Sequence, residues 1–302
     1  MENFLQQLLN GLTWGGIYAL IALGYTMVYG VLKLINFAHG DVYMVGAMTG
    51  YYAAHALGFA REPSLFGLAA TLLVAMLACG VLGAVIERVA YRPLRLRGAG
   101  RLAPLITAIG VSLLLQNAGQ LVFGADPKYF PPLLESRELA RVGGVAISNI
   151  QAAVLGTALL LMAALEFVVM RTRFGRAMRA VSYDGPAAAL MGVPVDRVVL
   201  GTFVLGSALA AAAGILVGLS NPKIEPLMGV MPGIKAFVAA VLGGIGHIPG
   251  AMAGGILLGV VETLVAGYLS STYRDAIAFV VLIAILLYRP TGLFGAPQTE
   301  KV

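Results

Sequence analysis

The sequence predicts an all-α polytopic membrane protein with about eight to nine transmembrane helices, some of them short or broken. Of its 302 residues, 59% are hydrophobic and only 11% are charged, whereas soluble domains carry about 25% charged residues. The apolar residues form charge-free runs of about 20 residues, the length that crosses hydrocarbon about 30 Å thick. Glycine supplies 39 residues, which suits closely packed transmembrane helices. We therefore expect one transmembrane domain over residues 1–302.

Charge-free runs and the segments between them set the expected spans. The first six are residues 8–31, 42–59, 64–86, 102–123, 145–165 and 198–219. Residues 87–101 carry five arginines against one acid and predict a cytoplasmic loop, whereas the balanced, proline-containing segment 124–141 predicts an external one. Gly11 and Gly15 in the first span, and the small residues spaced by four over 206–218 in the sixth, predict tight helix contacts.

The carboxyl-terminal third contains a break in an apolar block. Residues 243–251 read GGIGHIPGA, where Pro249 removes a hydrogen-bond donor and the glycines weaken a helix. We expect a short crossing over residues 232–242, a full span over 251–269 and a last span over 276–288. The residues expected to form the break are Gly243, Gly244, Gly246, His247, Pro249 and Gly250. A nucleotide-binding glycine loop is disfavoured, because no strand precedes it and Pro249 replaces the third glycine.

These spans give nine crossings, with the amino terminus outside and the carboxyl terminus inside. On this threading 13 of the 20 lysines and arginines lie inside and seven outside, as the positive-inside rule requires. The net charge of +6 is dispersed over loops, so a nucleic-acid partner is disfavoured. The single cysteine, Cys79, can form no intramolecular disulfide. The amino terminus lacks the basic region of a signal peptide, so a retained first helix is expected.

Residues 171–192 form a polar, basic segment between two apolar blocks. Four arginines near one helical stripe predict a short amphipathic helix at its start. They are Arg171, Arg173, Arg176 and Arg179. A turn at Gly185 and Pro186 and a second short helix over 187–191 are expected to follow. The arginines either hold a loop in the cytoplasm as topogenic charges or contact a soluble partner.

Polar residues at membrane depth are further candidates for function. Asn36 and His39 lie three residues apart beside Gly40 and Asp41. Irregular backbone at membrane depth is stable only against protein or a water-filled path, so these residues mark either a translocation path or gate, or a helix cap at a cytoplasmic turn. Glu262 lies in an apolar span and forms either a structural hydrogen bond or a substrate contact.

Gln116 and Asn117 in the fourth span pose the same question, with interhelical hydrogen bonds as the default. The three histidines are isolated from acidic or cysteine partners at metal-ligand spacing, so no metal site is expected. An intramembrane enzyme is the alternative from another class, and requires His39, Asp41 and Glu262 to converge. The chain has no G-x-x-x-x-G-K-[ST] phosphate loop, so any ATP hydrolysis would take place in another subunit.

Four stretches carry a family resemblance. They are GIYALIALGYTMVYGVLKLINFAHGDVYMVGA at residues 16–47, FGRAMRAVSYDGPAAALMGVPVDRV at 174–198, AAVLGGIGHIPGAMAGGILLGVVE at 239–262 and YRDAIAFVVLIAILLYRPTGLFG at 273–295. NFAHG and RPTGLFG together are specific, although either alone would be weak. Over nearly its whole length the chain resembles the LivH-type permeases of the branched-chain (hydrophobic) amino acid ABC importer family.

The resemblance implies the vitamin B12 type (type II) importer fold and a multi-pass location in the bacterial inner membrane. It implies that about residues 171–197 form a cytoplasmic coupling loop that docks on ATP-binding subunits. The residues it assigns to docking are Phe174, Gly175, Arg176, Arg179, Ala180, Ala188 and Gly192. The implied partners are a paralogous, LivM-like second permease, two ATP-binding subunits that hold ATP and Mg²⁺, and a periplasmic substrate-binding protein.

The resemblance also implies a transport subunit, with no enzyme activity or cofactor of its own, that moves branched-chain or other hydrophobic amino acids. A broader range of amino acids, or urea or a short amide, is the alternative cargo within the same class. Selectivity is expected to reside mostly in the binding protein, because a passage for hydrophobic amino acids needs only to be weakly polar.

Overall fold

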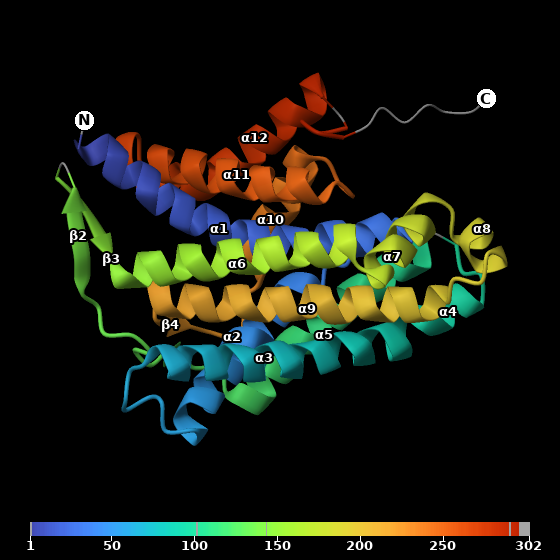
Figure 1. The fold of residues 1–302 in the computed structure, drawn as a ribbon, viewed down its shortest axis with the longest axis horizontal. Coiled ribbons are helices and arrows are strands. Elements are labelled where there is room, and N and C mark those ends of the chain that lie inside the picture. The colour runs from blue at the N-terminus through green and yellow to red at the C-terminus, as the bar shows by residue number, and fades with distance from the viewer. Residues whose placement is uncertain (1, 101, 143, 290, 296–302) are drawn as a thin grey trace.

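The computed structural model describes residues 2–100, 102–142, 144–289 and 291–295. Long helices lie side by side along the longest axis of the molecule (Figure 1). In the described residues, seven helices are long and apolar enough to cross a membrane, and an eighth apolar helix, Val230–Gly243, is shorter. The predicted all-α polytopic architecture is confirmed.

Each of the nine predicted spans corresponds to one helix in the described part of the chain. The helices are α1 (Glu2–Leu32), α2 (His39–Ala56), α3 (Leu65–Ile86), α5 (Leu102–Phe123), α6 (Asn149–Arg171), α9 (Val195–Ser220), α10 (Val230–Gly243), α11 (Ile248–Tyr268) and α12 (Arg274–Tyr288). A 3₁₀ turn, η2 (Ser271–Tyr273), joins the last two. Helices α2 and α10 are the two that fall outside the seven long apolar spans, because α2 carries several polar residues and α10 is short.

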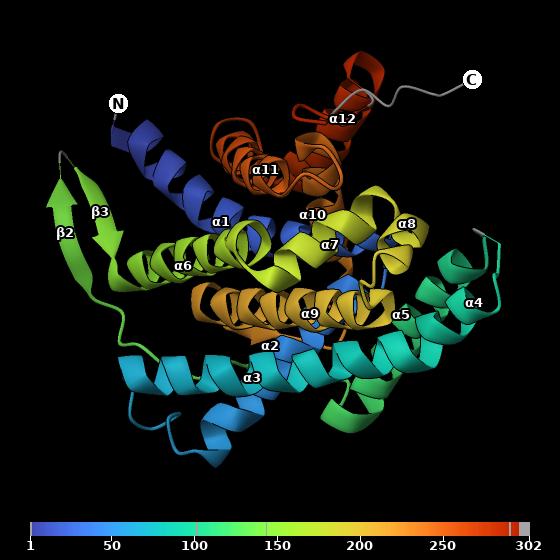
Figure 2. The same ribbon diagram turned by 45° about the vertical axis from the view of Figure 1, so that its right-hand side comes forward.

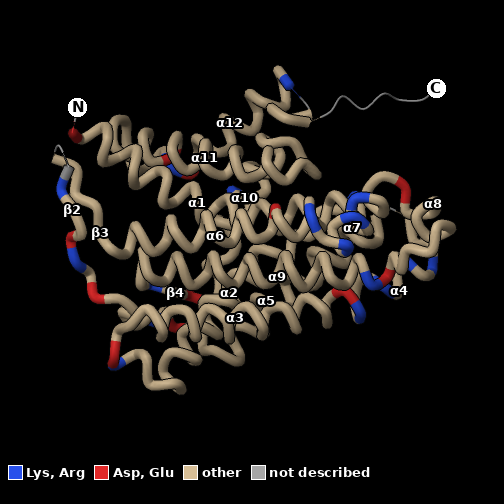
Figure 3. Tube along the Cα trace, viewed as in Figure 1, with Lys and Arg blue, Asp and Glu red and all other residues tan. Residues whose placement is uncertain are grey.

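The connections gather at two ends of this bundle. At the amino-terminal end, where α1 begins, β1 (Lys128–Tyr129) pairs antiparallel with β4 (Lys223–Ile224), and β2 (Glu138–Val142) pairs antiparallel with β3 (Val145–Ser148). The opposite end holds α4 (Arg92–Leu96), α7 (Arg173–Tyr183) and α8 (Gly185–Leu190). Lysines and arginines concentrate around these three helices (Figure 3). We call this the basic end, and the positive-inside rule predicts that it faces the cytoplasm.

Glycines hold the central helices at close distance. A Cβ placed on Gly15 of α1 would lie 2.7 Å from the Ile256 Cα of α11, and one on Gly214 of α9 would lie 2.8 Å from the Ala47 nitrogen of α2. Real side chains do not fit at these distances, so the backbones approach as closely as small residues allow. The tight contacts predicted for the first and sixth spans are therefore present. Figure 2 shows α1 and α11 side by side from a second direction.

The helix that begins at Leu65 extends further than predicted. Residues 87–96, expected in a cytoplasmic loop, continue α3 as a π-helical segment, η1 (Glu87–Tyr91), followed by α4. The arginines mark where a membrane would end, and a helix can run on into water beyond that level. Arg101 and Lys301, whose charges the topology prediction used, and Pro290 of the RPTGLFG motif lie outside the described residues.

Two further boundaries differ from the prediction. Residues 145–148 form β3 instead of the start of a span, and α6 begins at Asn149 behind a capping box of Ser148 and Gln151. Lys235, left by the threading among the external charges, lies in α10 with only 5% of its surface exposed. The predicted short crossing over residues 232–242 contains Lys235, although the charge count placed it outside.

Candidate functional site

Helices α2 and α10 both begin inside the bundle. Lys33 follows the end of α1 with a φ of 55°, and the chain then turns back between the helices. The ring of His39 lies against Gly24 of α1, because a Cβ on Gly24 would lie 2.1 Å from the His39 Nε2. Gly24 precedes the end of α1 by eight residues, which is about 12 Å along the helix. The predicted break at residues 33–41 therefore lies within the bundle, although its part in transport stays a prediction.

Glycines bring the two helix starts together. A Cβ on Gly40 of α2 would lie 2.6 Å from the carbonyl oxygen of Gly229, the N-cap of α10. The same atom would lie 3.0 Å from the Gly233 Cα, in the first turn of α10. Only glycine fits this crossing, so Gly40 has a structural reason to be there besides any role in a gate.

A cavity of about 390 Å³ lies beside the two helix starts. We call it the interior cavity, and it is open on one side, where Ile109 and Leu113 of α5 are 48% and 54% exposed. Its walls come from α1, α2, α5, α10 and α12 and are mostly apolar, with Phe37, Phe237 and Phe279 among the lining residues. Asp41 and Ser112 bring polar groups to it. A chamber of this kind, apolar with a few placed polar groups, is typical of a small-molecule site.

The predicted path residues separate into different environments. Gln116 lines the interior cavity and donates from Nε2 to the Ser112 hydroxyl at 3.1 Å, and Ser112 in turn donates to Asp41 Oδ2. Asn117 instead donates to the Leu113 carbonyl of its own helix at 2.7 Å and is exposed. Asn36 is buried, and its Oδ1 accepts a hydrogen bond from the Tyr91 hydroxyl at 2.9 Å.

Glu262 belongs to a second buried polar cluster, away from Asp41 and its partners. Its Oε1 lies 2.6 Å from Lys235 Nζ, 2.6 Å from Arg274 Nε and 3.2 Å from the Tyr18 hydroxyl. Lys235 also reaches Asp275 at 2.6 Å. Structural hydrogen bonding, one of the two predicted roles of Glu262, matches this geometry. Glu262 was selected because it is an ionisable residue in an apolar segment. Lys235 meets the same criterion, but the sequence interpretation missed it.

The described residues do not assemble the site that an intramembrane enzyme would need. Asp41 is bonded to Ser112, whereas Glu262 is bonded to Lys235, Arg274 and Tyr18. No group of three or more histidine, cysteine or acidic side chains in this part of the chain is arranged to hold a metal ion.

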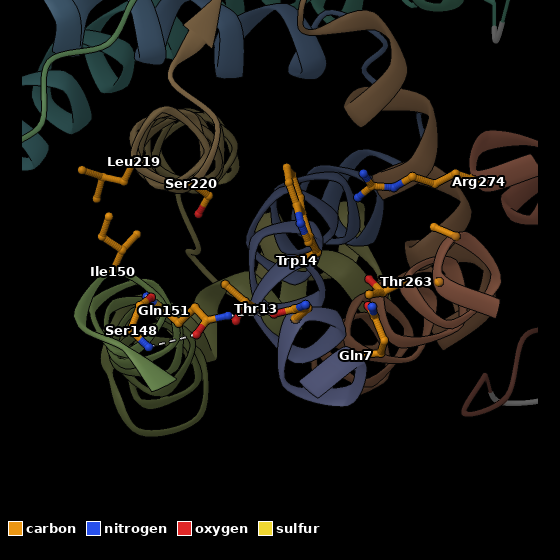
Figure 4. Close-up of a pocket in the computed structure, with 13 residues that line it drawn as sticks. Gln7, Thr13, Trp14, Ser148, Ile150, Gln151, Leu219, Ser220, Thr263 and Arg274 are labelled. Atoms are coloured by element: carbon orange, nitrogen blue, oxygen red, sulfur yellow. Dashed lines mark hydrogen bonds between the residues drawn. The ribbon is translucent and has the colours of Figure 1, made fainter. Parts of the chain in front are cut away.

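A larger, more polar cavity of about 540 Å³ opens at the amino-terminal end, among α1, α6, α9 and α11. Figure 4 shows its lining: Gln7, Thr13 and Trp14 of α1 face Ser148 and Gln151 on one side and Thr263 on the other. The Arg274 guanidinium lies 4.9 Å from the centre of the Trp14 ring. This cavity therefore lies beside the Glu262 cluster and opens toward the end opposite the basic one.

The basic segment forms two helices fixed to the bundle. Thr172 caps α7 by accepting from the Gly175 N–H at 3.1 Å, and a Cβ on Gly175 would lie 2.1 Å from the Val169 carbonyl oxygen. The Phe174 ring covers Gly201 of α9, and Arg179 donates a hydrogen bond to the Val169 carbonyl. Three of the predicted docking residues, Phe174, Gly175 and Arg179, thus attach α7 to its neighbours.

The predicted turn at Gly185 and Pro186 is wrong. Both residues lie in the first turn of α8, whose N-cap, Asp184, accepts from the Ala187 N–H at 2.9 Å. Proline is favoured in a first helical turn, where its missing N–H would be unpaired in any case. Ala188 is buried, and α8 is followed by Gly192 with a φ of 83°.

An apolar and basic surface faces outward from these helices. Arg176 and Ala180 are exposed on α7. Three large side chains accompany them: Tyr183, Leu190 and Met191 are 95%, 89% and 85% exposed. We call these five residues the α7–α8 surface. The sequence interpretation missed the three large ones, although large apolar residues in a polar loop were a usable signal.

The glycine-rich break meets the carboxyl-terminal segment. Helix α10 ends at Gly243, and the Leu293 and Phe294 N–H groups donate to the Leu242 and Gly243 carbonyls at 2.9 and 3.3 Å. These bonds satisfy carbonyls that a helix end leaves without partners. The Phe294 ring stacks on His247 at 6.2 Å.

The break itself differs in one respect from the prediction. Gly244 and Gly246 adopt φ values of 99° and 93°, as a turn of glycines can. Pro249, however, lies in the first turn of α11, where His247 Nδ1 accepts from the Gly250 N–H at 3.0 Å. The proline therefore starts a helix instead of interrupting one.

The glycine-rich break and the basic segment lie next to each other, as expected because the predicted topology puts both on the same side of the membrane. Arg179 and Ser182 of α7 line a cavity of about 50 Å³ together with Gly246 and Ile248. A Cβ on Gly30, near the end of α1, would lie 3.7 Å from the Ser182 Oγ and 3.8 Å from the Gly246 Cα.

Comparison with known proteins agrees with this architecture. A protein-family model described as "Branched-chain amino acid transport system / permease component" matches residues 7–286. The chain belongs to this family of permease components. As a permease with seven long apolar helices in its described residues, it is a multi-pass membrane protein.

Curated relatives match the permease along its whole length. The high-affinity branched-chain amino acid transport system permease protein BraD of Pseudomonas aeruginosa is 46% identical over 304 residues, 99% of this chain and 98% of the relative. The corresponding LivH protein of Escherichia coli K12 is 45% identical over 303 residues, with the same coverage. A probable LivH protein of Methanocaldococcus jannaschii is 29% identical, covering 95% of this chain and 91% of the relative.

One solved structure is similar in outline. It is titled "An inward-facing conformation of a putative metal-chelate type ABC transporter" and is 18% identical, with a TM-score of 0.49 over 94% of this chain and 85% of that one.

Proposed function

We propose that this chain is the transmembrane permease subunit of an ABC importer that carries branched-chain or other hydrophobic amino acids across the bacterial inner membrane. The observation that carries the proposal is full-length identity of 45–46% to relatives named as high-affinity branched-chain amino acid permeases. The mostly apolar interior cavity of about 390 Å³ supports it, because it offers a weakly polar chamber of a size suited to a small ligand.

In this proposal the α7–α8 surface receives an ATP-binding subunit, which binds ATP and Mg²⁺. Exposed Tyr183, Leu190 and Met191 offer the large side chains that anchor protein interfaces. The contact of the Phe174 ring with Gly201 would transmit the movement of a docked subunit to α9. The hydrogen bond from Arg179 to the Val169 carbonyl would transmit it to α6. The topogenic effect of the arginines is compatible with this role.

The same movement would reach the interior cavity through α10. Its carboxyl-terminal end lies beside α7, where Gly246 and Ser182 line one small cavity, and its amino-terminal end lies at Gly40 beside the interior cavity. Helices that touch through glycine, as α9 does with α2 at Gly214, present smooth surfaces along which two packing arrangements are feasible. We therefore assign Gly40 and Gln116, which line the interior cavity, to the path, and buried Asn36 and His39 to the packing behind it. Asn117 is exposed and does not line this cavity, so its predicted place in the path has no support from the cavity lining.

The further partners follow from the same proposal: a second, LivM-like permease, a second ATP-binding subunit and a periplasmic binding protein. The experiment that tests the function is uptake in cells whose copy of this gene is deleted and then restored on a plasmid. Restored cells should take up radioactive leucine, and unlabelled isoleucine and valine should compete, whereas glutamate and urea should not. Competition by urea but not by valine would contradict the proposed cargo.

A further inference from the structure

We propose that Asp41 and the amino-terminal end of α10 form a site for the zwitterionic head of an amino acid, in which Asp41 pairs with the α-ammonium group. The inference rests on the proposed function and deepens it, because it places a substrate contact in the interior cavity. Asp41 directly follows the NFAHG segment, and the start of α10 lies almost 190 residues further along the chain.

Asp41 is a buried carboxylate without a cation. It is 2% exposed, its Oδ2 accepts from Ser112, and among the described residues its Oδ1 has no hydrogen-bond partner. No ion pair within the described part of the chain includes it. Its position in the first turn of α2 favours a negative charge there, since a helix start carries partial positive charge. A buried carboxylate in an apolar chamber is costly unless a positive charge meets it.

Glu262, another buried carboxylate, shows the arrangement in which the protein itself supplies the cations. Glu262 is 0% exposed, and Lys235, Arg274 and Tyr18 all bond its Oε1. Glu262 is neutralised by the protein itself, and Asp41 is not. A substrate ammonium group would supply the missing charge at Asp41, in the same way that Lys235 supplies it at Glu262.

The start of α10 offers the complementary charge. Its N-cap, Gly229, has no side chain to cap the helix, and among the described residues no side chain makes a capping hydrogen bond there. Gly229 and Val230 line the interior cavity together with Asp41, and a Cβ on Gly229 would lie 3.2 Å from the Asp41 Cα. The Val230 N–H already donates to the Leu227 carbonyl at 3.3 Å, and Pro232 has no N–H. The helix start therefore favours the carboxylate of the same amino acid mainly through its partial positive charge.

The rest of the cavity suits an apolar side chain. Its walls include Phe37, Ile109, Leu113, Phe237, Phe279 and Leu282. A ligand with an ammonium group, a carboxylate and a hydrocarbon side chain could contact Asp41, the start of α10 and the apolar lining at the same time. Urea has none of the three groups, so the cavity favours amino acids among the possible cargoes.

The test is leucine uptake by proteoliposomes that contain the full complex, with Asp41 replaced by the isosteric asparagine. We expect Asp41→Asn to lower ATP-driven leucine uptake at least about tenfold, the effect of losing one charge-assisted hydrogen bond. ATP hydrolysis stimulated by the loaded binding protein should stay within about twofold, because docking and hydrolysis do not use this carboxylate. Asp41→Glu should recover part of the uptake. The matched control is Asp126→Asn in an exposed loop, which should transport as the wild type does.

Two results would overturn the inference. One is Asp41→Asn uptake within about twofold of the wild type in an assembled complex. The other is loss of assembly in Asp41→Asn with no recovery in Asp41→Glu, because the carboxylate would then serve folding. Either result leaves the proposed function intact if the wild-type complex imports leucine, whereas a wild-type complex that imports no hydrophobic amino acid contradicts the proposed function itself.

Discussion

Lys235 Nζ lies 2.6 Å from Oε1 of Glu262, and Arg274 Nε approaches the same oxygen at 2.6 Å. Lys235 belongs to α10, Glu262 to α11 and Arg274 to α12, so one buried ion cluster joins the last three helices of the bundle. Breaking a buried pair on one side leaves an uncompensated charge, which costs far more than the pair contributes when intact. The short helix α10 thus has a fixed partner although it is too short to be a conventional membrane span.

Replacing Glu262 should destabilise the fold. We expect Glu262→Gln to lower the free energy of unfolding by about 3–5 kcal/mol, because Lys235 and Arg274 would lose their buried counter-charge. Thermal and denaturant unfolding of the purified protein in detergent measures this. The matched control is Glu225→Gln, which removes the partner of Lys223 from an exposed pair at 3.4 Å and should cost about 1 kcal/mol or less. Unchanged unfolding of Glu262→Gln together with lost uptake would instead assign Glu262 to the substrate path.

Large residues of the α7–α8 surface should control docking of the ATP-binding subunits. We expect Leu190→Asp and Met191→Asp each to lower copurification of those subunits at least about tenfold, since a charge would enter a desolvated contact. The permease itself should fold normally, because both side chains are almost fully exposed. Leu139→Asp, a 61% exposed leucine in β2 at the opposite end, is the control and should copurify normally. Normal copurification of all three variants would move the docking site elsewhere.

Arg176 and Arg179 should differ when their charges are reversed one at a time. Arg176 is exposed, and within the described residues its side chain makes no hydrogen bond or ion pair, so Arg176→Glu should weaken docking and leave the thermal unfolding of the permease unchanged. Arg179→Glu should lower the unfolding temperature as well, because it removes the donor to the Val169 carbonyl at the junction of α6 and α7. Equal behaviour of the two variants in both assays would contradict this division of roles.

Gly40 should tolerate no side chain. In Gly40→Ala the new Cβ would lie 2.6 Å from the Gly229 carbonyl oxygen, so the starts of α2 and α10 would have to separate. We expect a loss of about 1–3 kcal/mol in unfolding free energy, as for other overpacked sites, and reduced leucine uptake. Gly110→Ala on α5, where a Cβ meets nothing within 4 Å, should leave both unchanged. A Gly40→Ala protein with wild-type stability and uptake would show that the two helix starts are not fixed by this contact.

The sequence predicts the helices better than it predicts their ends. Apolar runs, divided by charged segments and by the glycines and proline of the GGIGHIPGA break, locate all nine spans, because these signals act locally. Charge was a poor guide to helix ends, since residues 87–96 carry arginines and remain helical. Proline was misjudged at Pro186 and Pro249, because the same residue type that breaks a helix interior is favoured in a first turn.

The sites depend on contacts between distant residues, which a single sequence does not reveal. Asp41 was noticed as a neighbour of His39 and as a member of the alternative enzyme site, whereas its hydrogen-bond donor, Ser112, is 71 residues away. Lys235 and Glu262 are separated by 27 residues, and only the hairpin of α10 and α11 brings them together. Phe174 and Arg179 were selected through the family resemblance, yet their contacts with Gly201 and Val169 depend on how α7 folds back on the bundle.

The central claim, that this chain is the passage of an ATP-driven importer and not its motor, is tested most directly in one pair of vesicle assays. Leucine accumulation and ATP hydrolysis are measured in the same proteoliposomes, with the complete complex or with this chain alone. We predict that leucine accumulates only with the complete complex, binding protein and ATP, and that this chain alone hydrolyses no ATP. ATP hydrolysis by the purified chain, or concentrative leucine uptake without the ATP-binding subunits, would contradict the account.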